Sequence, residues 1–189
     1  SIGTEISRQI NYSNPKKIII LDHSELNIYR FNKKKNNKKF SLMLGDIKDE
    51  NLMRNILIKN KIDYIFHAAA YKHVKFLEGN IYSAIKNNIL GTYSILKAIK
   101  GKKIKLIFIS TDKAVKPKNI LGITKRIGEL LIKFIFSKKG YKNSKYFIVR
   151  FGNVIGSDGS ALPYFLNQIK NNLPILLTDK KMERYFMSI

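Results

Sequence analysis

Short apolar runs that alternate with amphipathic segments constrain the fold of this chain most strongly. Five runs have the length of a strand, and they occupy residues 17–22, 40–44, 63–70, 104–109 and 145–151. Apolar runs of this length are typical of strands buried on both faces of a sheet. Because helical segments separate them, the sequence predicts an α/β fold with a doubly wound parallel sheet.

The run at 104–109 ends in a concentrated group of reactive side chains. Residues 110–113 read Ser-Thr-Asp-Lys, and Lys125 lies near the start of the next apolar-periodic segment. Ligands bind at the carboxyl ends of the strands in open α/β sheets, so these residues are candidates for chemistry. Taken alone, the same stretch also suits an ordinary helix cap.

Two other strand ends offer groups that suit a dinucleotide. Asp22 ends the first run and lies about 20 residues after Gly3, the interval at which dinucleotide-binding folds place the carboxylate that holds the adenosine ribose. Ala68 and Ala69 end the third run, and small side chains there let a flat ligand approach the backbone. Alanines that merely pack under a helix would give the same pattern.

Between and beyond the strands, the periodicity predicts helices and one further short strand. We expect helices at 1–10, from Ser24 onward, and at 48–59, 80–99, 127–136 and 163–170, with a strand at 175–177. In the long helix, Gly91 is expected to allow close packing. Asn87 and Asn88 are expected to face water, or to bond to the adjacent strand.

Composition excludes several classes of protein. The chain has 189 residues, 44% of them hydrophobic, and no cysteine, so a disulfide framework and a thiolate metal site are excluded. Its three histidines show no metal-ligand spacing, and no metal is expected. No apolar run is long enough to cross a bilayer and no signal peptide opens the chain, so we expect a cytoplasmic domain.

The formal net charge of +23 has two explanations. A basic patch for nucleic acid is one. Compositional drift is the other, because the excess is mostly lysine, and Asn and Ile, which also have A/T-rich codons, are plentiful. Aromatic residues do not interleave with the basic runs, and residues 33–39 resemble a solvated loop. We therefore favour drift and do not expect a nucleic-acid partner.

Several short motifs, in order, carry a family resemblance. They are Ser1-Ile2-Gly3-Thr4-Glu5-Ile6, His67-Ala68-Ala69-Ala70-Tyr71-Lys72-His73-Val74, Asn87-Asn88-Ile89-Leu90-Gly91-Thr92, Ser110-Thr111-Asp112-Lys113-Ala114, Gly122-Ile123-Thr124-Lys125-Arg126, Arg150-Phe151-Gly152-Asn153-Val154-Ile155-Gly156-Ser157 and Arg184-Tyr185-Phe186-Met187. In this order the chain resembles the extended short-chain dehydrogenase/reductase superfamily. Within it, the chain is most similar to the polysaccharide-biosynthesis (CapD-like) nucleotide-sugar 4,6-dehydratases.

The resemblance implies a Rossmann-like fold truncated at both ends. Residues 1–152 would form the NAD-binding domain without its first strand and glycine loop, and residues 153–189 would begin a smaller substrate-binding part. Gly3 matches the last glycine of that loop. Relatives often carry a membrane region, which is absent from this sequence, and a homo-oligomer is compatible with the family.

The resemblance also implies a reaction. NAD would act as a catalyst in the 4,6-dehydration of a UDP-N-acetylglucosamine-like sugar, giving a 4-keto-6-deoxy sugar nucleotide for surface polysaccharide or glycan. Asp112 would protonate the departing C6 hydroxyl and Lys113 would take the C5 proton. Thr111 would bond the C4 oxygen, and Lys125 would hold the nicotinamide ribose and supply positive charge.

Further site residues follow from the same resemblance. For the cofactor they are Gly3, Asp22, Asp46, Ile47, Ala68, Ala69, Ser110 and Lys125, and for the sugar nucleotide they are Lys72, Asn153, Ser157 and Arg184. An acid at Asp22 favours NAD over NADP. Leu121 stands where the superfamily usually has a tyrosine, which leaves the C4 base open among Lys125, Thr111 with Lys113, and water.

Two alternatives remain beside dehydration. One is a nucleotide-sugar 4-epimerase on the same scaffold, although epimerisation needs no acid at C6. The other is an inactive, truncated remnant. Two features would suit a remnant: the drift toward lysine, and Glu183 in a position where the family usually has threonine. Saturable binding of NAD would argue against a remnant.

Overall fold

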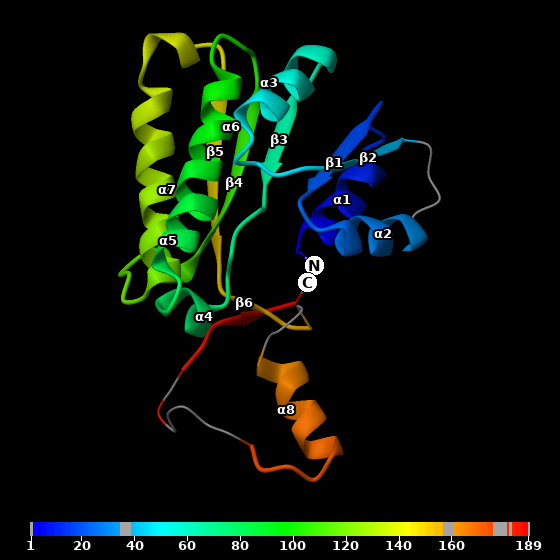
Figure 1. Cartoon of the computed structure of the whole chain (residues 1–189), viewed down its shortest axis with the longest axis vertical. Helices are drawn as coiled ribbons and strands as arrows, with labels where there is room; N and C mark the ends of the chain where they lie inside the picture. The colour runs from blue at the N-terminus through cyan, green and yellow to red at the C-terminus, as the bar shows by residue number, and fades with distance from the viewer. Residues whose placement is uncertain (1, 35–38, 157–160, 176–180, 182, 189) are drawn as a thin grey trace.

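A computed structural model of the chain describes residues 2–34, 39–156, 161–175, 181 and 183–188. Its main sheet has three parallel strands in the order β3 (Tyr64–His67), β4 (Lys105–Thr111) and β5 (Lys145–Phe151). β4 is central, and its last residue, Thr111, pairs with Phe151 at the end of β5. These three strands confirm the predicted α/β class with parallel pairing (Figure 1).

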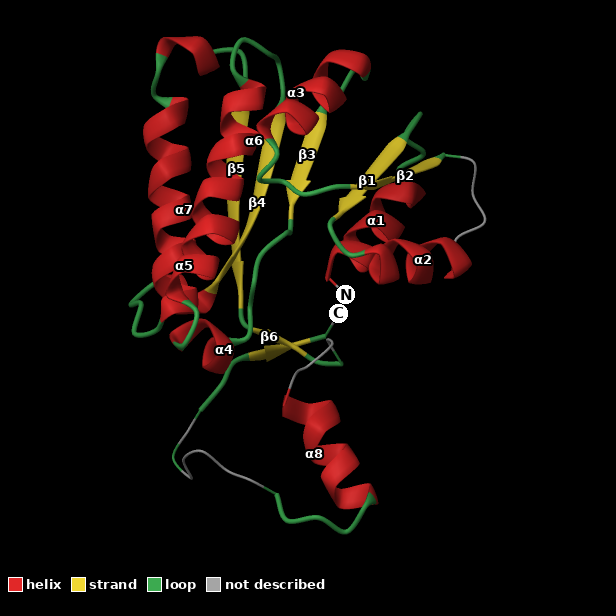
Figure 2. Cartoon of the chain, viewed as in Figure 1, coloured by secondary structure: helices red, strands yellow, loops and turns green. Residues whose placement is uncertain are grey.

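A second parallel pair lies beside the main sheet. β1 (Ile18–Asp22) and β2 (Phe40–Leu44) run in register, so that Asp22 pairs with Leu44. Within the described residues, no strand pairing joins this pair to β3, so β1 to β5 form two hydrogen-bonded groups and not one continuous sheet. The strands of both groups nevertheless point toward the same side of the molecule (Figure 2).

Each helix predicted from the sequence is present, with some differences at the ends. The helices are α1 (Ile2–Tyr12), α2 (Glu25–Lys34), α3 (Glu50–Lys59), α4 (Val74–Glu78), α5 (Ile81–Ala84), η1 (Ile85–Leu90), α6 (Gly91–Ile99), η2 (Asp112–Ala114), α7 (Ile120–Phe136), η3 (Lys139–Tyr141) and α8 (Ala161–Lys170). α7 begins before the predicted residue 127 because Asn119 caps it: the Asn119 side chain accepts from the Gly122 amide at 2.8 Å. Lys125 therefore lies within α7.

The core lies between the main sheet and the helices α3, α6 and α7, which cover one of its faces (Figure 1). Leu106 and Phe108 on β4, Leu96 on α6 and Ile132 on α7 are fully buried there. Each such side chain contributes about 1.5–3 kcal/mol through removal of apolar surface from water. These buried side chains hold α7 against β4, and both elements carry residues of the candidate site.

The predicted helix at 80–99 is a continuous helical run with a π-helical segment inside it. α5, η1 and α6 follow one another without a break, and η1 is the π segment. Such segments are rare and frequent at functional sites. Asn87 and Asn88 are 5% and 2% exposed, so the expectation that they face water is wrong. Gly91 does allow close packing, since a Cβ there would lie 2.6 Å from Cδ1 of Ile47.

After β5, the chain leaves the main sheet. β6 (Asn153–Val154) pairs in parallel with β7 (Phe186–Met187), and α8 lies between them in sequence. Figure 1 shows this part below the carboxyl ends of the main strands. Of the strand predicted at 175–177, residues 176 and 177 lie outside the described residues, and residue 175 is not in a strand.

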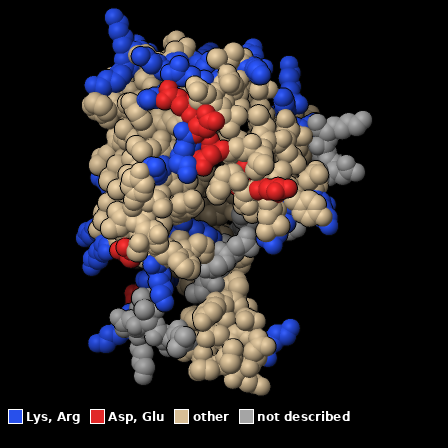
Figure 3. Space-filling model, in the orientation of Figure 1, with Lys and Arg blue, Asp and Glu red and all other residues tan. Residues whose placement is uncertain are grey.

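Charge is unevenly spread on the face shown in Figure 3, where Lys and Arg side chains gather along the upper edge. That edge carries the amino ends of β3, β4 and β5, opposite the strand ends that bear the candidate site. Of the helices in the described ranges, none is long and apolar enough to cross a bilayer. The described residues also contain no group of three or more His, Asp or Glu that could hold a metal ion.

Candidate active site

Three predicted catalytic residues lie together where β4 ends. Thr111 is the last residue of β4, and Asp112 and Lys113 open η2. The Thr111 hydroxyl donates to Oδ1 of Asp112 at 2.8 Å, and the Lys113 ammonium lies 3.0 Å from the same oxygen. Both side chains of the ion pair are partly exposed, at 22% for Lys113 and 30% for Asp112. A carboxylate, an amine and a hydroxyl thus meet at one accessible point.

The charge of Asp112 is set by these contacts. Burial by itself raises the pKa of the carboxyl, but hydrogen bonds from Lys113 and Thr111 outweigh burial and hold the pKa below its usual value. Asp112 is therefore ionised at neutral pH, with its charge matched by Lys113. It can accept a proton before it can donate one.

Lys113 also connects this group to the part of the chain after β5. Its ammonium donates to Oδ1 of Asn153, at the start of β6, at 3.2 Å. The backbone N–H of Asn153 in turn donates to the carbonyl of Tyr185 at 2.9 Å. Arg184 precedes Tyr185 and is exposed, so one predicted substrate residue, Asn153, contacts Lys113, and another, Arg184, lies next to the residue that Asn153 binds.

Lys125 reaches the same strand from α7. It is 7% exposed, and its ammonium donates to the carbonyl of Ile109 at 2.7 Å while lying 4.5 Å from the centre of the Phe108 ring. Burial lowers its pKa to about 8, and the nearby carboxylate of Glu129 partly opposes that effect. Lys125 is therefore a buried amine that is charged at neutral pH, directly behind the end of β4.

A glycine lets α7 approach the turn that carries Asp112 and Lys113. A Cβ built on Gly122 would lie 2.4 Å from the carbonyl oxygen of Lys113, closer than real side chains allow. Any other residue at this position would push α7 and η2 apart. The spacing between Lys125 and the Asp112–Lys113 pair thus depends on the missing side chain at Gly122.

A buried carboxylate that the sequence patterns did not predict lies one helical turn after Lys125. Glu129 has no exposed surface and receives hydrogen bonds from Ser110 at 2.6 Å, from Arg150 at 2.8 and 2.5 Å, and from Arg126 at 3.1 Å. The sequence does hold a signal, since Glu129 lies four residues after Lys125 and is followed by Leu130 and Leu131. A lone acid on the apolar face of a helix needs a buried partner.

A second group of buried side chains, linked by hydrogen bonds, supports the end of β3. The Thr92 hydroxyl donates its hydrogen bond to the carbonyl of Asn88 at 2.7 Å. Its oxygen, which lies 2.9 Å from Nε2 of His67, must therefore accept a hydrogen bond from that nitrogen. Burial, and secondarily the charge of Lys125, lower the pKa of His67 to about 3. The Asn88 side chain accepts from the Tyr71 backbone N–H and donates to the Tyr71 carbonyl. It also donates to the Thr124 hydroxyl. The loop after β3 is thereby fixed.

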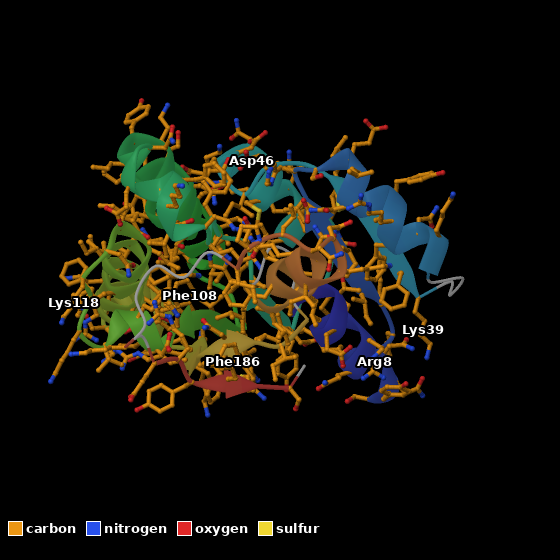
Figure 4. The ribbon with its side chains drawn as sticks, turned by 90° about the horizontal axis from the view of Figure 1, so that it is seen from below. Arg8, Lys39, Asp46, Phe108, Lys118 and Phe186 are labelled. Atoms are coloured by element: carbon orange, nitrogen blue, oxygen red, sulfur yellow. The ribbon has the colours of Figure 1, made fainter. Side chains whose placement is uncertain are left out.

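The predicted adenosine-side residues make local contacts. Asp22 ends β1, and its carboxylate accepts from the Ser24 amide at 2.8 Å. Asp46 follows β2 and pairs with Lys48 at 3.1 Å; burial raises its pKa, but hydrogen bonds from Lys48 prevail and lower it. Figure 4 shows Asp46 well apart from Phe108 across this end of the molecule.

The remaining predicted cofactor residues differ in how accessible they are. Gly3 lies in α1, where a Cβ would meet open space, and Ile47 is buried against Gly91. Ala69 is exposed and Ala68 half-buried after β3. Ser110 is 3% exposed with its hydroxyl committed to Glu129, so its side chain is not open to a ligand.

The remaining positions are two predicted substrate residues and the residue that replaces the tyrosine of the superfamily. Lys72 is exposed in the loop after β3, whereas Ser157 lies outside the described residues. Leu121, where the superfamily usually has a tyrosine, is 7% exposed and packs with Leu77 and Ala84. No proton acceptor occupies that position.

Parallel strands with helices packed on them, and reactive groups at the carboxyl ends, define a Rossmann-like α/β fold. The family description "Polysaccharide biosynthesis protein" matches residues 1–189, so the chain belongs to that family. The predicted family resemblance is confirmed.

Named relatives include more than one kind of protein. The capsular polysaccharide biosynthesis protein CapD of Staphylococcus aureus is 40% identical over 195 residues, which cover 100% of this chain and 32% of the relative. A UDP-glucose 4-epimerase of Rickettsia bellii is 36% identical over 183 residues, covering 92% of this chain and 53% of the relative. The chain thus spans about a third to a half of the length of these relatives.

Solved structures confirm the fold. The X-ray structure of Pen from Bacillus thuringiensis matches with a TM-score of 0.93 at 37% identity, over 99% of this chain and 58% of that one. The dTDP-glucose 4,6-dehydratase DesIV from Streptomyces venezuelae, solved with NAD bound, matches with a TM-score of 0.87 at 20% identity, over 99% of this chain and 65% of that one. At that identity, the second match supports the fold alone.

Proposed function

We propose that this chain forms the catalytic core of an NAD-dependent nucleotide-sugar 4,6-dehydratase that acts on a UDP-N-acetylglucosamine-like substrate. The observation that carries the proposal is the Asp112–Lys113 pair with Thr111 on the same oxygen. Elimination of water across C5 and C6 needs an acid at the C6 oxygen and a base at C5. The pair supplies both at the end of the central strand.

The residues present fit NAD in the chemistry of their donors and acceptors. Asp22 offers a carboxylate, already oriented by Ser24, to ribose hydroxyls, and Lys125 offers a charged donor. Ala68 and Ala69 leave the end of β3 without bulky side chains. NAD would accept the hydride from sugar C4 and return it to C6. Asp22 would also repel the additional phosphate of NADP.

Thr111 and Asp112 together can remove the proton of the C4 hydroxyl. Leu121 cannot act as a base, and the Lys125 ammonium is directed to Ile109. The Thr111 hydroxyl, placed on the C4 oxygen, already donates to the ionised Asp112 carboxylate at 2.8 Å. The C4 hydroxyl proton passes to Thr111 as the Thr111 proton passes to Asp112, which leaves Asp112 as a neutral acid.

The same proton then leaves with the C6 hydroxyl. Once Asp112 is protonated, the Lys113 ammonium loses the charge that it pairs with and gives one proton to solvent. The neutral amine then removes the C5 proton, and protonated Asp112 delivers its proton to the C6 oxygen, so that the C5–C6 double bond forms as water departs. Lys113 returns the C5 proton when hydride reaches C6 and then takes a proton back from solvent. The proton of the C4 hydroxyl and the C6 hydroxyl together make the water, and Asp112 ends ionised and paired with the Lys113 ammonium, as in the structure.

For the sugar nucleotide, we propose that residues 153–189 begin the part that receives it. Asn153 contacts Lys113 directly, and its backbone N–H donates to the carbonyl of Tyr185, the residue after Arg184. A guanidinium can donate two parallel hydrogen bonds to a diphosphate, which suits Arg184 to that role. Lys72 would add charge from the loop after β3.

A 4-epimerase is the second candidate, because a UDP-glucose 4-epimerase is among the relatives. The two activities differ in the mass of the product, since dehydration removes one water and epimerisation removes none. We expect the complete protein, supplied with UDP-N-acetylglucosamine and NAD, to release a keto sugar nucleotide that is lighter by one water in mass spectrometry. An unchanged mass with a new stereoisomer would establish the epimerase, and no conversion without NAD binding would refute both.

A further inference from the structure

Glu129 is a buried carboxylate that the proposed reaction does not use. It lies in the middle of α7 with no exposed surface. Burial raises its pKa, but hydrogen bonds from Arg150, Ser110 and Arg126 outweigh burial and lower it. Glu129 is therefore ionised inside the protein, which is costly unless every lone pair finds a donor.

The donors come from three elements. Oε1 accepts from Ser110 on β4 at 2.6 Å and from Nε of Arg150 on β5 at 2.8 Å, and Oε2 accepts from Arg126 on α7 and again from Arg150. Ser110 and Arg150 are direct partners in the strand register. One carboxylate thus ties α7 to the last residues of two neighbouring strands.

Lys125 lies one helical turn before Glu129 and binds the neighbouring residue of β4. Its ammonium donates to Ile109, and Glu129 accepts from Ser110, the next residue along the strand. Residues four apart on a helix project from the same face. Two successive turns of α7 therefore hold two successive residues of β4, immediately before Thr111 and Asp112.

We propose that Glu129 is a positioning residue: it fixes α7 against the ends of β4 and β5 and keeps the Lys125 ammonium charged at the site. The inference rests on the proposed function in the role given to Lys125. Without Glu129, the guanidiniums of Arg126 and Arg150 would lose the carboxylate that they share.

Electrostatics around Lys125 support this role. The titratable and charged groups on the surrounding elements are His67 on β3, Asp112 and Lys113 on η2, Arg126 and Glu129 on α7, and Arg150 on β5. His67 is neutral above pH 3 because its pKa is about 3, and Asp112 is paired with Lys113. Burial lowers the pKa of Lys125 to about 8, and the charge of Glu129 acts in the opposite direction. Loss of that charge should lower the pKa further.

The test is a ¹³C NMR titration of lysine side chains labelled at Cε, made on the complete protein without NAD or sugar. The spectrum of Lys125→Met identifies the Lys125 signal, which we expect to titrate near pH 8 in the unchanged protein. In Glu129→Gln, which keeps the size of the side chain, we expect the titration midpoint to fall by about one unit or more. A matched control is Glu78→Gln, because Glu78 accepts from the Ile120 amide at the start of α7, and within the described ranges no hydrogen bond or ion pair joins it to Ser110 or Arg150.

A folded Glu129→Gln protein with an unchanged Lys125 midpoint would overturn the inference. If that variant does not fold, Glu129→Asp keeps the charge but draws it back by one methylene, and the Lys125 midpoint should again fall; an unchanged midpoint there would be equally decisive. Since the titration uses neither NAD nor sugar, its failure leaves the proposed reaction untouched. Failure of the unchanged protein to bind NAD would refute the reaction and leave the titration result standing.

Discussion

Lys113 and Asn153 are 40 residues apart in sequence, and the ammonium of one donates to the side-chain oxygen of the other at 3.2 Å. This contact joins the turn after β4 to the first residue of β6. The proposed acid and base therefore do not stand alone at the end of the sheet. They are linked to the β6–β7 strand pair, and Arg184 lies two residues before β7, where we place the sugar nucleotide.

The first prediction concerns the proposed acid and base. Asp112→Asn and Lys113→Met should each lower kcat by about 10²- to 10⁴-fold, because each removes one proton-transfer group. Neither should weaken NAD binding greatly, since both residues act on the sugar. Isothermal titration with NAD and a product assay measure the two effects. Lys118→Met, in the exposed loop after η2, is the matched control and should retain the activity of the unchanged protein.

Lys125→Met should separate binding from stability. The buried ammonium carries a desolvation cost, which is the main reason for its pKa of about 8. Removing the charge should leave the free energy of unfolding unchanged or raise it, while the affinity for NAD falls by at least about tenfold, the loss expected for a charged hydrogen bond. Urea unfolding and NAD titration give the two values. A variant that loses stability but binds NAD normally would contradict the role of Lys125.

Gly122→Ala should disturb the site through the backbone. The added Cβ would lie 2.4 Å from the Lys113 carbonyl, so α7 and η2 must separate, at a cost of about 1–3 kcal/mol. Gly3→Ala is the control for stability, because its Cβ meets nothing within 4 Å and alanine favours the helix by up to about 1 kcal/mol. Thermal unfolding of both variants measures the difference. Equal changes in stability would show that the close approach at Gly122 is unimportant.

His67 should make the protein sensitive to mild acid. Its pKa is about 3 in the folded chain, against about 6.5 when unfolded. Between these values the unfolded state binds one more proton, so stability falls as the pH drops below 6.5, by about 1.4 kcal/mol per unit. His67→Gln should remove this slope between pH 6.5 and 5, where the carboxylates of Asp46, Asp112 and Glu129 stay ionised. His23→Gln, at an exposed position, should keep the slope in urea unfolding.

Much of the fold followed from hydrophobic periodicity alone. β5 lies at the predicted residues, and β1, β2 and β4 begin and end within two residues of their predicted ends. Periodicity could not show that β1 to β5 divide into two groups, because pairing between strands is a tertiary property. Nor could it show the π segment, whose extra residue in the turn directs Asn87 and Asn88 inward.

The site was predictable where polar residues follow a strand directly. Thr111, Asp112 and Lys113 come together for that reason. Glu129 and Arg150 were missed because their role exists only through contacts between α7 and β5, far apart in sequence. Ser110 was placed on the cofactor side, but strand alternation turns its side chain to the buried face beneath α7, opposite to that of Thr111.

The most direct test of the account follows a deuterium atom. UDP-N-acetylglucosamine that carries deuterium at C4 is given to the complete protein with NAD, and the product is analysed by NMR and mass spectrometry. The account predicts a 4-keto product, lighter by one water, with the deuterium transferred to C6. Deuterium that remains at C4 in a product that has lost no water would contradict it.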